Sequence, residues 1–380
     1  MRRLLRAGFR VLIASVLAGC ATRLRFDEAS TVRDPAWECV FQRDSGWLGG
    51  DGAATVVVGD RVLWLFGDSG VGRVEGGKYA PGSTLVNNAA AIAPISMDAP
   101  PAPGDVMFAW NDRSPDGKPA ALFTPARRGE WYWPTGGGAE VEGRGLVLFM
   151  SRLFRPREHD DGVWNFEGRG SDLLWIENPG PDPRAWRARV VATPGAVGDD
   201  LRPAPRRETW GAAALIRRRT LFIYGVDATD GFNKKAILAR VEASKACDTS
   251  AWEFFAGAGW SGRLEDAVPV AERIADEFSV SEVGGEFVLV FSEPMLGRGI
   301  LVRTARSLEG PWGEAMRVYE CPEPAADKRL MVYSAKAHPE LSQAGELLVS
   351  YCVNSSDFWH MLSDATIYRP RFVRVRVDGR

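Results

Sequence analysis

Two aspartates flank a predicted β-hairpin near the N-terminus, and their spacing suggests chemistry. Asp51 lies in Gly49-Gly50-Asp51-Gly52-Ala53, and Asp68 lies in Phe66-Gly67-Asp68-Ser69. The tight turn Gly59-Asp60 between them predicts a register that places Asp51 directly opposite Asp68, with Cβ atoms about 4.5–5.5 Å apart. Two like charges at this separation are unfavourable unless a ligand, a metal or a shared proton compensates. Paired carboxylates perform glycoside hydrolysis, in which one donates a proton and the other activates water or attacks the sugar.

A purely structural interpretation of the same two residues stays open. Asp51 would then cap a loop, and Asp68 would hold a turn by accepting hydrogen bonds from backbone N–H groups. The two interpretations differ in one observable: whether both carboxylates point into one open cavity.

A recurring unit positions these residues. Each unit has a first strand of small or apolar residues, a polar turn and a strongly apolar second strand, and the five units span residues 53–69, 138–152, 210–225, 278–293 and 338–354. Helical periodicity is nearly absent. We therefore predict an all-β protein, a five-bladed β-propeller of antiparallel sheets over residues 37–378, in which small residues crowd near the axis. A two-sheet sandwich is the alternative, and the alternating run 369–377 is expected to form an edge strand.

Corresponding positions around the predicted ring are polar or aromatic. In a propeller, one end of every inner strand faces the same funnel, so these positions should converge. Glu208 is the candidate third carboxylate and general acid, beside Asp51 and Asp68. The candidate substrate-binding residues are Trp133, Glu277, Lys336, His338 and Asn354. Individually, each of these further residues also fits a salt-bridge or capping role.

The N-terminus has the features of an export signal. Arginines at positions 2, 3, 6 and 10 precede a short apolar run, Val11 to Leu17, that is too short to span a bilayer. Leu17-Ala18-Gly19-Cys20 resembles the bacterial lipobox, which implies cleavage before Cys20 and its lipidation. An ordinary secretory signal is the alternative. We expect a signal peptide over 1–20, a linker over 21–36, and a lipid-anchored protein in the cell envelope, at the outer membrane because Ala21 follows the cysteine.

Composition and residue spacing limit which partners, metals and cross-links we expect. The 380 residues carry 47 Lys+Arg and 49 Asp+Glu, for a net charge of −2, which argues against a dedicated nucleic-acid binder. The three His are scattered and form no zinc pattern. No cofactor is expected; carboxylates and carbonyls on the axis could hold calcium, but no residue pattern specifies it. Export permits disulfides, yet the pairing of Cys39, Cys247, Cys321 and Cys352 stays open, as does the oligomeric state.

Three motifs resemble a known family. Trp47–Ala53 followed by Leu63–Ser69, the run Tyr333–Glu340, and Thr304–Trp312 are similar to a bacterial family known only as a domain of unknown function, whose opening signature is close to GGDGA…LWLFGDT. The resemblance implies a five-bladed propeller related to endo-D-arabinanases and arabinanase-like glycoside hydrolases. By position, it implies that Asp51 and Asp68 are the catalytic acidic residues; Ser69 departs from the usual Thr.

Two functional hypotheses follow from these observations. The first is a lipoprotein glycoside hydrolase that acts on an arabinan-like polysaccharide through paired carboxylates in the funnel. The second is a non-catalytic glycan-binding or envelope-interaction propeller that uses the same funnel, since a fold alone does not decide function.

Overall fold

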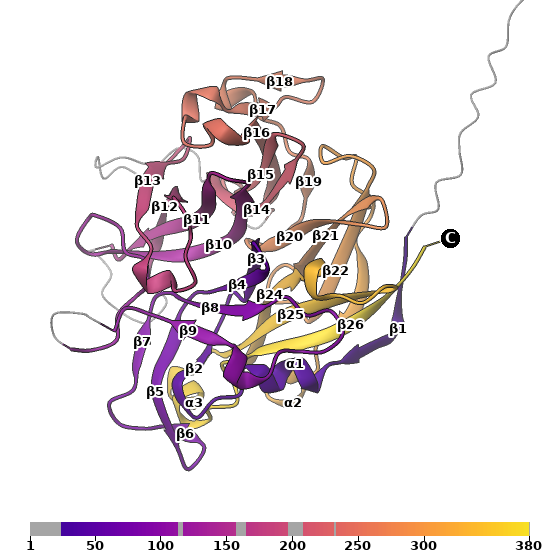
Figure 1. Cartoon of the computed structure of the whole chain (residues 1–380). Helices are drawn as coiled ribbons and strands as arrows, with labels where there is room; N and C mark the ends of the chain where they lie inside the picture. The colour runs from indigo at the N-terminus through magenta and orange to yellow at the C-terminus, as the bar shows by residue number, and fades with distance from the viewer. Residues whose placement is uncertain (1–23, 113–116, 157–164, 197–207, 232, 380) are drawn as a thin grey trace, which may run out of the picture.

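Five antiparallel sheets surround one axis in the computed structural model, which describes residues 24–112, 117–156, 165–196, 208–231 and 233–379. Figure 1 shows the first strands of the sheets, β3, β10, β14, β20 and β24, around a common centre, with the later strands further out. The protein is therefore a five-bladed β-propeller, and the all-β prediction is confirmed.

The blades follow the chain from the inner strand outward. Their strands are β3 (Ala54–Val58), β4 (Arg61–Phe66), β8 (Ala89–Pro94) and β9 (Met107–Ala109) in blade one; β10 (Glu130–Val141), β11 (Gly145–Phe154), β12 (Glu167–Ile176) and β13 (Ala188–Ala192) in blade two; β14 (Glu208–Arg217), β15 (Thr220–Asp227), β16 (Lys235–Glu242), β17 (Glu253–Phe255), β18 (Trp260–Ser261) and β19 (Ala271–Glu272) in blade three; β20 (Phe278–Val283), β21 (Glu286–Ser292), β22 (Gly299–Ala305) and β23 (Met316–Glu320) in blade four; and β24 (Leu330–Ala337), β25 (Glu346–Ser355), β26 (Pro370–Asp378) and β1 (Arg25–Arg33) in blade five.

A small additional sheet extends blade one. It contains β2 (Ser45–Gly50), β5 (Ser69–Glu75), β6 (Lys78–Tyr79) and β7 (Thr84–Val86). The described residues also form three short α-helices, α1 (Pro35–Val40), α2 (Glu323–Ala326) and α3 (Phe358–Ser363). Because β2 leads into β3 and β4 leads into β5, the first hairpin of the propeller continues beyond its blade into this sheet.

The inner strands approach one another closely at the axis. A Cβ atom on Gly137 would lie 2.3 Å from the Gly211 carbonyl oxygen, and one on Gly211 would lie 2.1 Å from the Phe149 Cβ atom. Gly211 also has a φ of +95°, a conformation that a side chain rarely adopts. Small residues are therefore required where β10 and β14 meet, as the composition of the first strands predicted.

The N-terminal strand closes the ring. β1 pairs with β26 as the outermost strand of blade five, and Arg317 of blade four forms an ion pair with Glu28. The linker expected for residues 21–36 is therefore wrong over Arg25–Arg33. The edge-strand prediction for 369–377 is also wrong, because β26 is paired on both sides, with β25 and with β1. The partner strand lies some 340 positions away in the chain, where local patterns carry no information.

Five hairpins occur as predicted, but the fifth begins earlier in the chain. Its first strand is β24, which ends at Ala337, and Pro339–Leu341 forms a 3₁₀ turn before β25. The segment that was predicted to begin the first strand at His338 is therefore the loop between β24 and β25. Because β24 ends at Ala337, His338 follows the first strand of this hairpin instead of beginning it.

Two further expectations can be compared with the described residues. Cys39, Cys247, Cys321 and Cys352 are all free thiols, so none of the pairings left open is formed. Within the described ranges, no helix is both long enough and apolar enough to cross a membrane. The signal-peptide segment and Cys20 lie outside the described residues.

Removing β1 should destabilise the propeller. A chain that begins at Asp34 leaves the long edge of β26 unpaired, and its melting temperature should fall by about 5 °C or more relative to a chain that begins at Leu24. Calorimetry on both proteins measures the difference. Equal melting temperatures would show that β1 does not contribute to closing the ring.

Candidate active site

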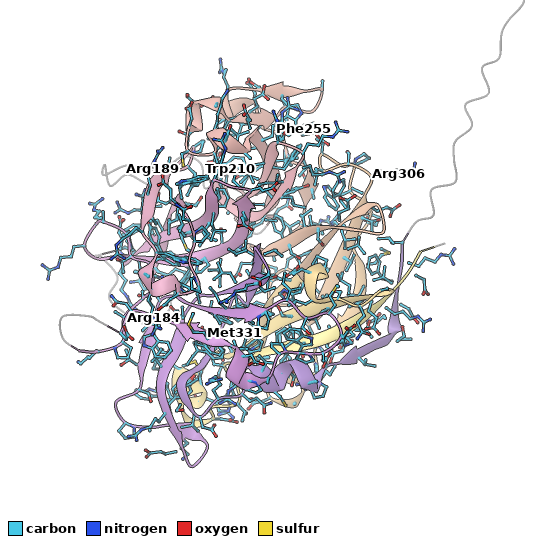
Figure 2. The ribbon with its side chains drawn as sticks, viewed as in Figure 1. Arg184, Arg189, Trp210, Phe255, Arg306 and Met331 are labelled. Atoms are coloured by element: carbon cyan, nitrogen blue, oxygen red, sulfur yellow. The ribbon has the colours of Figure 1, made fainter. Side chains whose placement is uncertain are left out.

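A cavity of about 810 Å³ opens at the end of the propeller where the inner strands begin. Its lining includes Asp51, Asp68, Trp133, Glu277 and Asn354, which come from blades one, two, four and five. Met331, near the start of β24, also lines it and lies close to the centre of the molecule in Figure 2. The structure therefore brings five of the predicted site residues to one place.

Asp51 and Asp68 occupy opposite positions in one hairpin. The register that pairs Ala54 with Leu65 continues unchanged to Gly50 and Ser69. Between these pairs, the Asp51 N–H donates to the Asp68 carbonyl over 3.3 Å. The predicted juxtaposition is confirmed, and both side chains are only partly exposed.

Tyrosines hold the Asp51 carboxylate. The Tyr333 hydroxyl donates to Asp51 Oδ2 over 2.6 Å, and Asn354 Nδ2 donates to the Tyr333 oxygen over 3.2 Å. A Cβ atom on Gly67 would lie 2.4 Å from Asp51 Oδ1, so only glycine leaves room for the carboxylate in this position. Asp51 is thus fixed by its neighbours and has few alternative orientations.

Nitrogen donors surround Asp68 instead. Trp133 Nε1 donates to Asp68 Oδ1 over 2.8 Å, and Asn87 Nδ2 donates to the same oxygen over 3.3 Å. Phe166 packs edge-on against the Trp133 ring, with 4.7 Å between centroids, and also lines the cavity. Both N–H groups favour the ionised form of Asp68.

A buried lysine contacts Glu277, a third carboxylate that lines the cavity. Lys336 is 2 % exposed, and its ammonium contacts Glu277 Oε2, the Ser334 hydroxyl and the Gly52 carbonyl oxygen. The Ser334 hydroxyl also donates to Glu277 over 2.6 Å. The ammonium and the hydroxyl together fix the Glu277 carboxylate beside the two aspartates.

Burial raises the pKa of both aspartates, and like charges add to the rise for Asp51. Burial raises the pKa of Asp51 to about 7, and the negative charges of Asp68 and Glu277 add to this rise, while hydrogen bonds from Tyr333 and Tyr368 oppose it. Burial also raises the pKa of Asp68, to about 6, against the opposing hydrogen bonds from Trp133 and Asn87. Asp51 therefore retains its proton to higher pH than Asp68.

Two of the candidate residues lie away from the cavity. Glu208, the candidate general acid, is buried opposite Asp227, and its carboxylate faces the loop at Gly195. His338 is fully buried between the hydroxyls of Thr55 and Ser350, at 2.8 and 2.7 Å. Burial and the Lys336 charge lower the pKa of His338 to about 3. The start of β24 lines the cavity, and His338 follows the other end of this strand, so His338 lies away from the cavity.

No metal centre emerges from the geometry. Among the residues that the structure describes, no group of three or more His, Cys, Asp or Glu side chains is arranged to hold a metal ion. The Glu277 carboxylate is paired with the Lys336 ammonium instead.

Comparison with protein families assigns the chain. Residues 34–377 match the family described as Domain of unknown function (DUF5005). The chain belongs to the DUF5005 family. The resemblance inferred from the sequence motifs is thereby confirmed at the level of the family. No curated protein matches this DUF5005 chain in sequence.

Solved structures share the fold of the DUF5005 chain. A protein from Bacteroides ovatus, named as a candidate hydrolase, superposes with a TM-score of 0.69 at 19 % identity, over 91 % of this chain and 90 % of its own. A GH32 β-fructofuranosidase from Bombyx mori (TM-score 0.46, 9 % identity, 94 % of this chain and 62 % of that one) and an exo-β-1,3-galactanase from Phanerochaete chrysosporium (0.45, 10 %, 86 % and 60 %) are more distant. The likeness to the first structure is one of fold.

Several residues of the DUF5005 site were not assigned a role from sequence. Tyr333 lies inside a motif that was singled out, but its hydroxyl contact with Asp51 crosses from blade five to blade one. Tyr368 precedes β26 in a loop, and Asn87 lies between β7 and β8. Only Tyr333 gave a detectable signal, as a polar aromatic residue just before a run of small residues.

The pH dependence of folding tests the burial of Asp51. An acid whose pKa is about 7 when folded, against 3.8 as its ordinary value, keeps its proton longer in the folded state, so stability falls as the pH rises from about 4 to about 7. Asp51→Asn removes this cost and should raise the melting temperature by about 2 °C or more at pH 8, but not at pH 4.

The matched control is Asp60→Asn in the exposed turn of the same hairpin, where the side chain is 97 % exposed. This variant should melt like the wild type at both pH values. Equal melting of wild type and Asp51→Asn at pH 8 would contradict a buried, repelled carboxylate.

Proposed function

We propose that this protein is a glycoside hydrolase that acts on a polysaccharide, with Asp51 and Asp68 as its catalytic residues. The observation that carries the proposal is the pair of facing, partly exposed carboxylates on one hairpin, both with raised pKa values, in one open cavity. Two carboxyl groups whose surroundings separate their protonation are the working groups of glycoside hydrolysis.

We propose a role for each residue on the basis of its surroundings. Asp51 keeps its proton to the higher pH and is the proton donor, since Asp68 and Glu277 repel its ionised form. Asp68 receives two N–H donors and is the ionised partner. Glu277 lies in the cavity where Glu208 was expected, and it is held by Lys336 as a positioning residue that keeps Asp51 protonated.

The reaction balances with these two groups and water. The Asp51 proton passes to the glycosidic oxygen as the bond from that oxygen to the anomeric carbon breaks. Water adds its hydroxyl to the anomeric carbon, directly or after attack by Asp68, and its remaining proton returns to the carboxylates. The protein is then restored to its starting protonation.

The substrate and location extend the proposal beyond the cavity. Arabinan is the first polymer to test, because the motifs around Asp51, Asp68 and Tyr333 resemble those of the arabinanase-related family. We place the enzyme at the cell envelope, anchored in the lipid bilayer through acylated Cys20, on the strength of the lipobox-like run Leu17–Cys20.

An assay for new reducing ends tests the activity. Protein lacking residues 1–20 is incubated with D-arabinan, L-arabinan, xylan and galactan. Asp51→Asn and Asp68→Asn should each lower kcat by about 10²–10⁴-fold on any polymer that is cleaved, because each removes a proton-transfer or nucleophilic group. Asp60→Asn serves as the control and should leave the rate unchanged. Cleavage that survives both site variants would place the activity elsewhere.

The pH profile tests the assignment of roles. Because the active form has Asp51 protonated and Asp68 ionised, kcat/KM should peak between about 6 and about 7. Trp133→Phe removes an N–H donor that stabilises ionised Asp68, so the acidic limb should move to higher pH while the alkaline limb stays. A shift of the alkaline limb alone would reverse the two roles.

A further inference from the structure

The mouth of the cavity is unusually apolar. Of the large hydrophobic side chains in the described part of the chain, the three most exposed are Trp359 at 75 %, Met295 at 70 % and Leu296 at 60 %. Met295 and Leu296 line the cavity, and Trp359 adjoins Phe358, which also lines it. Exposed apolar groups gathered around one opening mark a binding surface more than a chance distribution does.

Met295 and Leu296 are exposed at a conformational cost. Their φ angles are +61° and +56°, in the left-handed region that is unfavourable for residues other than glycine. The surrounding loop between β21 and β22 is closed by the Glu293 N–H, which donates to the Gly299 carbonyl over 2.7 Å, and by the Gly299 N–H, which donates to Glu293 Oε2 over 3.0 Å. The two apolar side chains are therefore held out from the blade by a fixed turn.

Trp359 is also held in place. It lies in α3, whose first turn is capped by Asp357 through the N–H groups of Trp359 and His360. Phe358 packs edge-on against the Trp359 ring, with 5.8 Å between centroids and 75° between planes. A rigid, exposed indole presents a flat apolar surface at low entropic cost.

These residues come from two blades; Met295 and Leu296 line the cavity, and Trp359 is the neighbour of Phe358, which lines it. Met295 and Leu296 follow β21 of blade four, whereas Trp359 follows β25 of blade five. We call Met295, Leu296 and Trp359 the apolar rim. Met295 and Leu296 line the same cavity as the carboxylates, so an occupant long enough to extend past the carboxylates can reach them, and Trp359 lies one residue beyond the lining residue Phe358. Sugar rings have apolar C–H faces that pack on such surfaces, while their hydroxyls remain in water.

We propose that the apolar rim binds the sugar units that flank the cleaved bond, so that the protein recognises a stretch of a polymer and not a single terminal sugar. This inference rests on the proposed function, because it takes the occupant of the cavity to be a glycan. It assigns substrate-binding residues outside the set predicted from the sequence.

Affinity gel electrophoresis tests the rim separately from catalysis. Asp51→Asn protein lacking residues 1–20 is run through gels containing D-arabinan, L-arabinan, xylan or galactan. In the gel that retards it, adding Trp359→Ala should weaken the apparent affinity about tenfold, and Trp359→Phe should restore most of it. Met295→Ala should weaken retardation, whereas Met97→Ala, an equally conservative change at an exposed residue away from the cavity, should not.

A second measurement uses the active protein. If the rim binds flanking sugars, Trp359→Ala should raise KM for the cleaved polymer about tenfold and leave cleavage of a single-sugar aryl glycoside within about twofold. Retardation that depends on Trp359 without any release of reducing ends would keep the rim and discard hydrolysis. Unretarded migration in all four gels, or equal retardation of Trp359→Ala and its parent, would overturn the rim proposal.

Discussion

The crowding of five strands around one axis is the constraint on which the rest of the structure depends. Where β10 meets β14, a single added Cβ atom would lie 2.3 Å from a backbone oxygen. Side chains of any size must therefore leave the axis at its ends, and the functional groups gather where the strands begin. The site is a consequence of this crowding. The small residues that let the blades meet also leave room for one long side chain, and the buried Lys336 occupies that space next to the carboxylates.

The balance of charge at the cavity follows from that placement. The negative charges of Asp68 and Glu277 both repel ionised Asp51. The buried Lys336 ammonium forms an ion pair with Glu277. Burial and the negative charges of Asp68 and Glu277 disfavour ionised Asp51 and raise its pKa. Folding tolerates this arrangement because the hydrogen bonds from Tyr333, Trp133 and Asn87 fix the carboxylates in place.

Local rules in the sequence predicted the part of the site that one hairpin builds. The Gly59-Asp60 turn determined the register, and the register placed Asp51 opposite Asp68. Non-local geometry decided the rest. Glu277 reaches the cavity and Glu208 does not, because the position of each residue depends on how its strand enters the blade. Strand β14, which begins at Glu208, is irregular between Trp210 and Ala213. His338 was misplaced because one strand was assigned too late, and the pairing of β1 with β26 leaves no local trace.

The first strand of the structure has a consequence for how the molecule is held. Leu24 packs against Gly284 at the turn between β20 and β21, and the Leu24 N–H donates to Glu286. Glu277, at the opposite end of β20, borders the cavity about 20 Å away along the strand. Leu24, the first residue that the structure describes, therefore lies on the face opposite the carboxylates. A molecule tethered by its N-terminus presents its cavity to the surrounding medium and turns its hairpin loops toward the support, so that long, free polymers reach the site more readily than groups lying on that support.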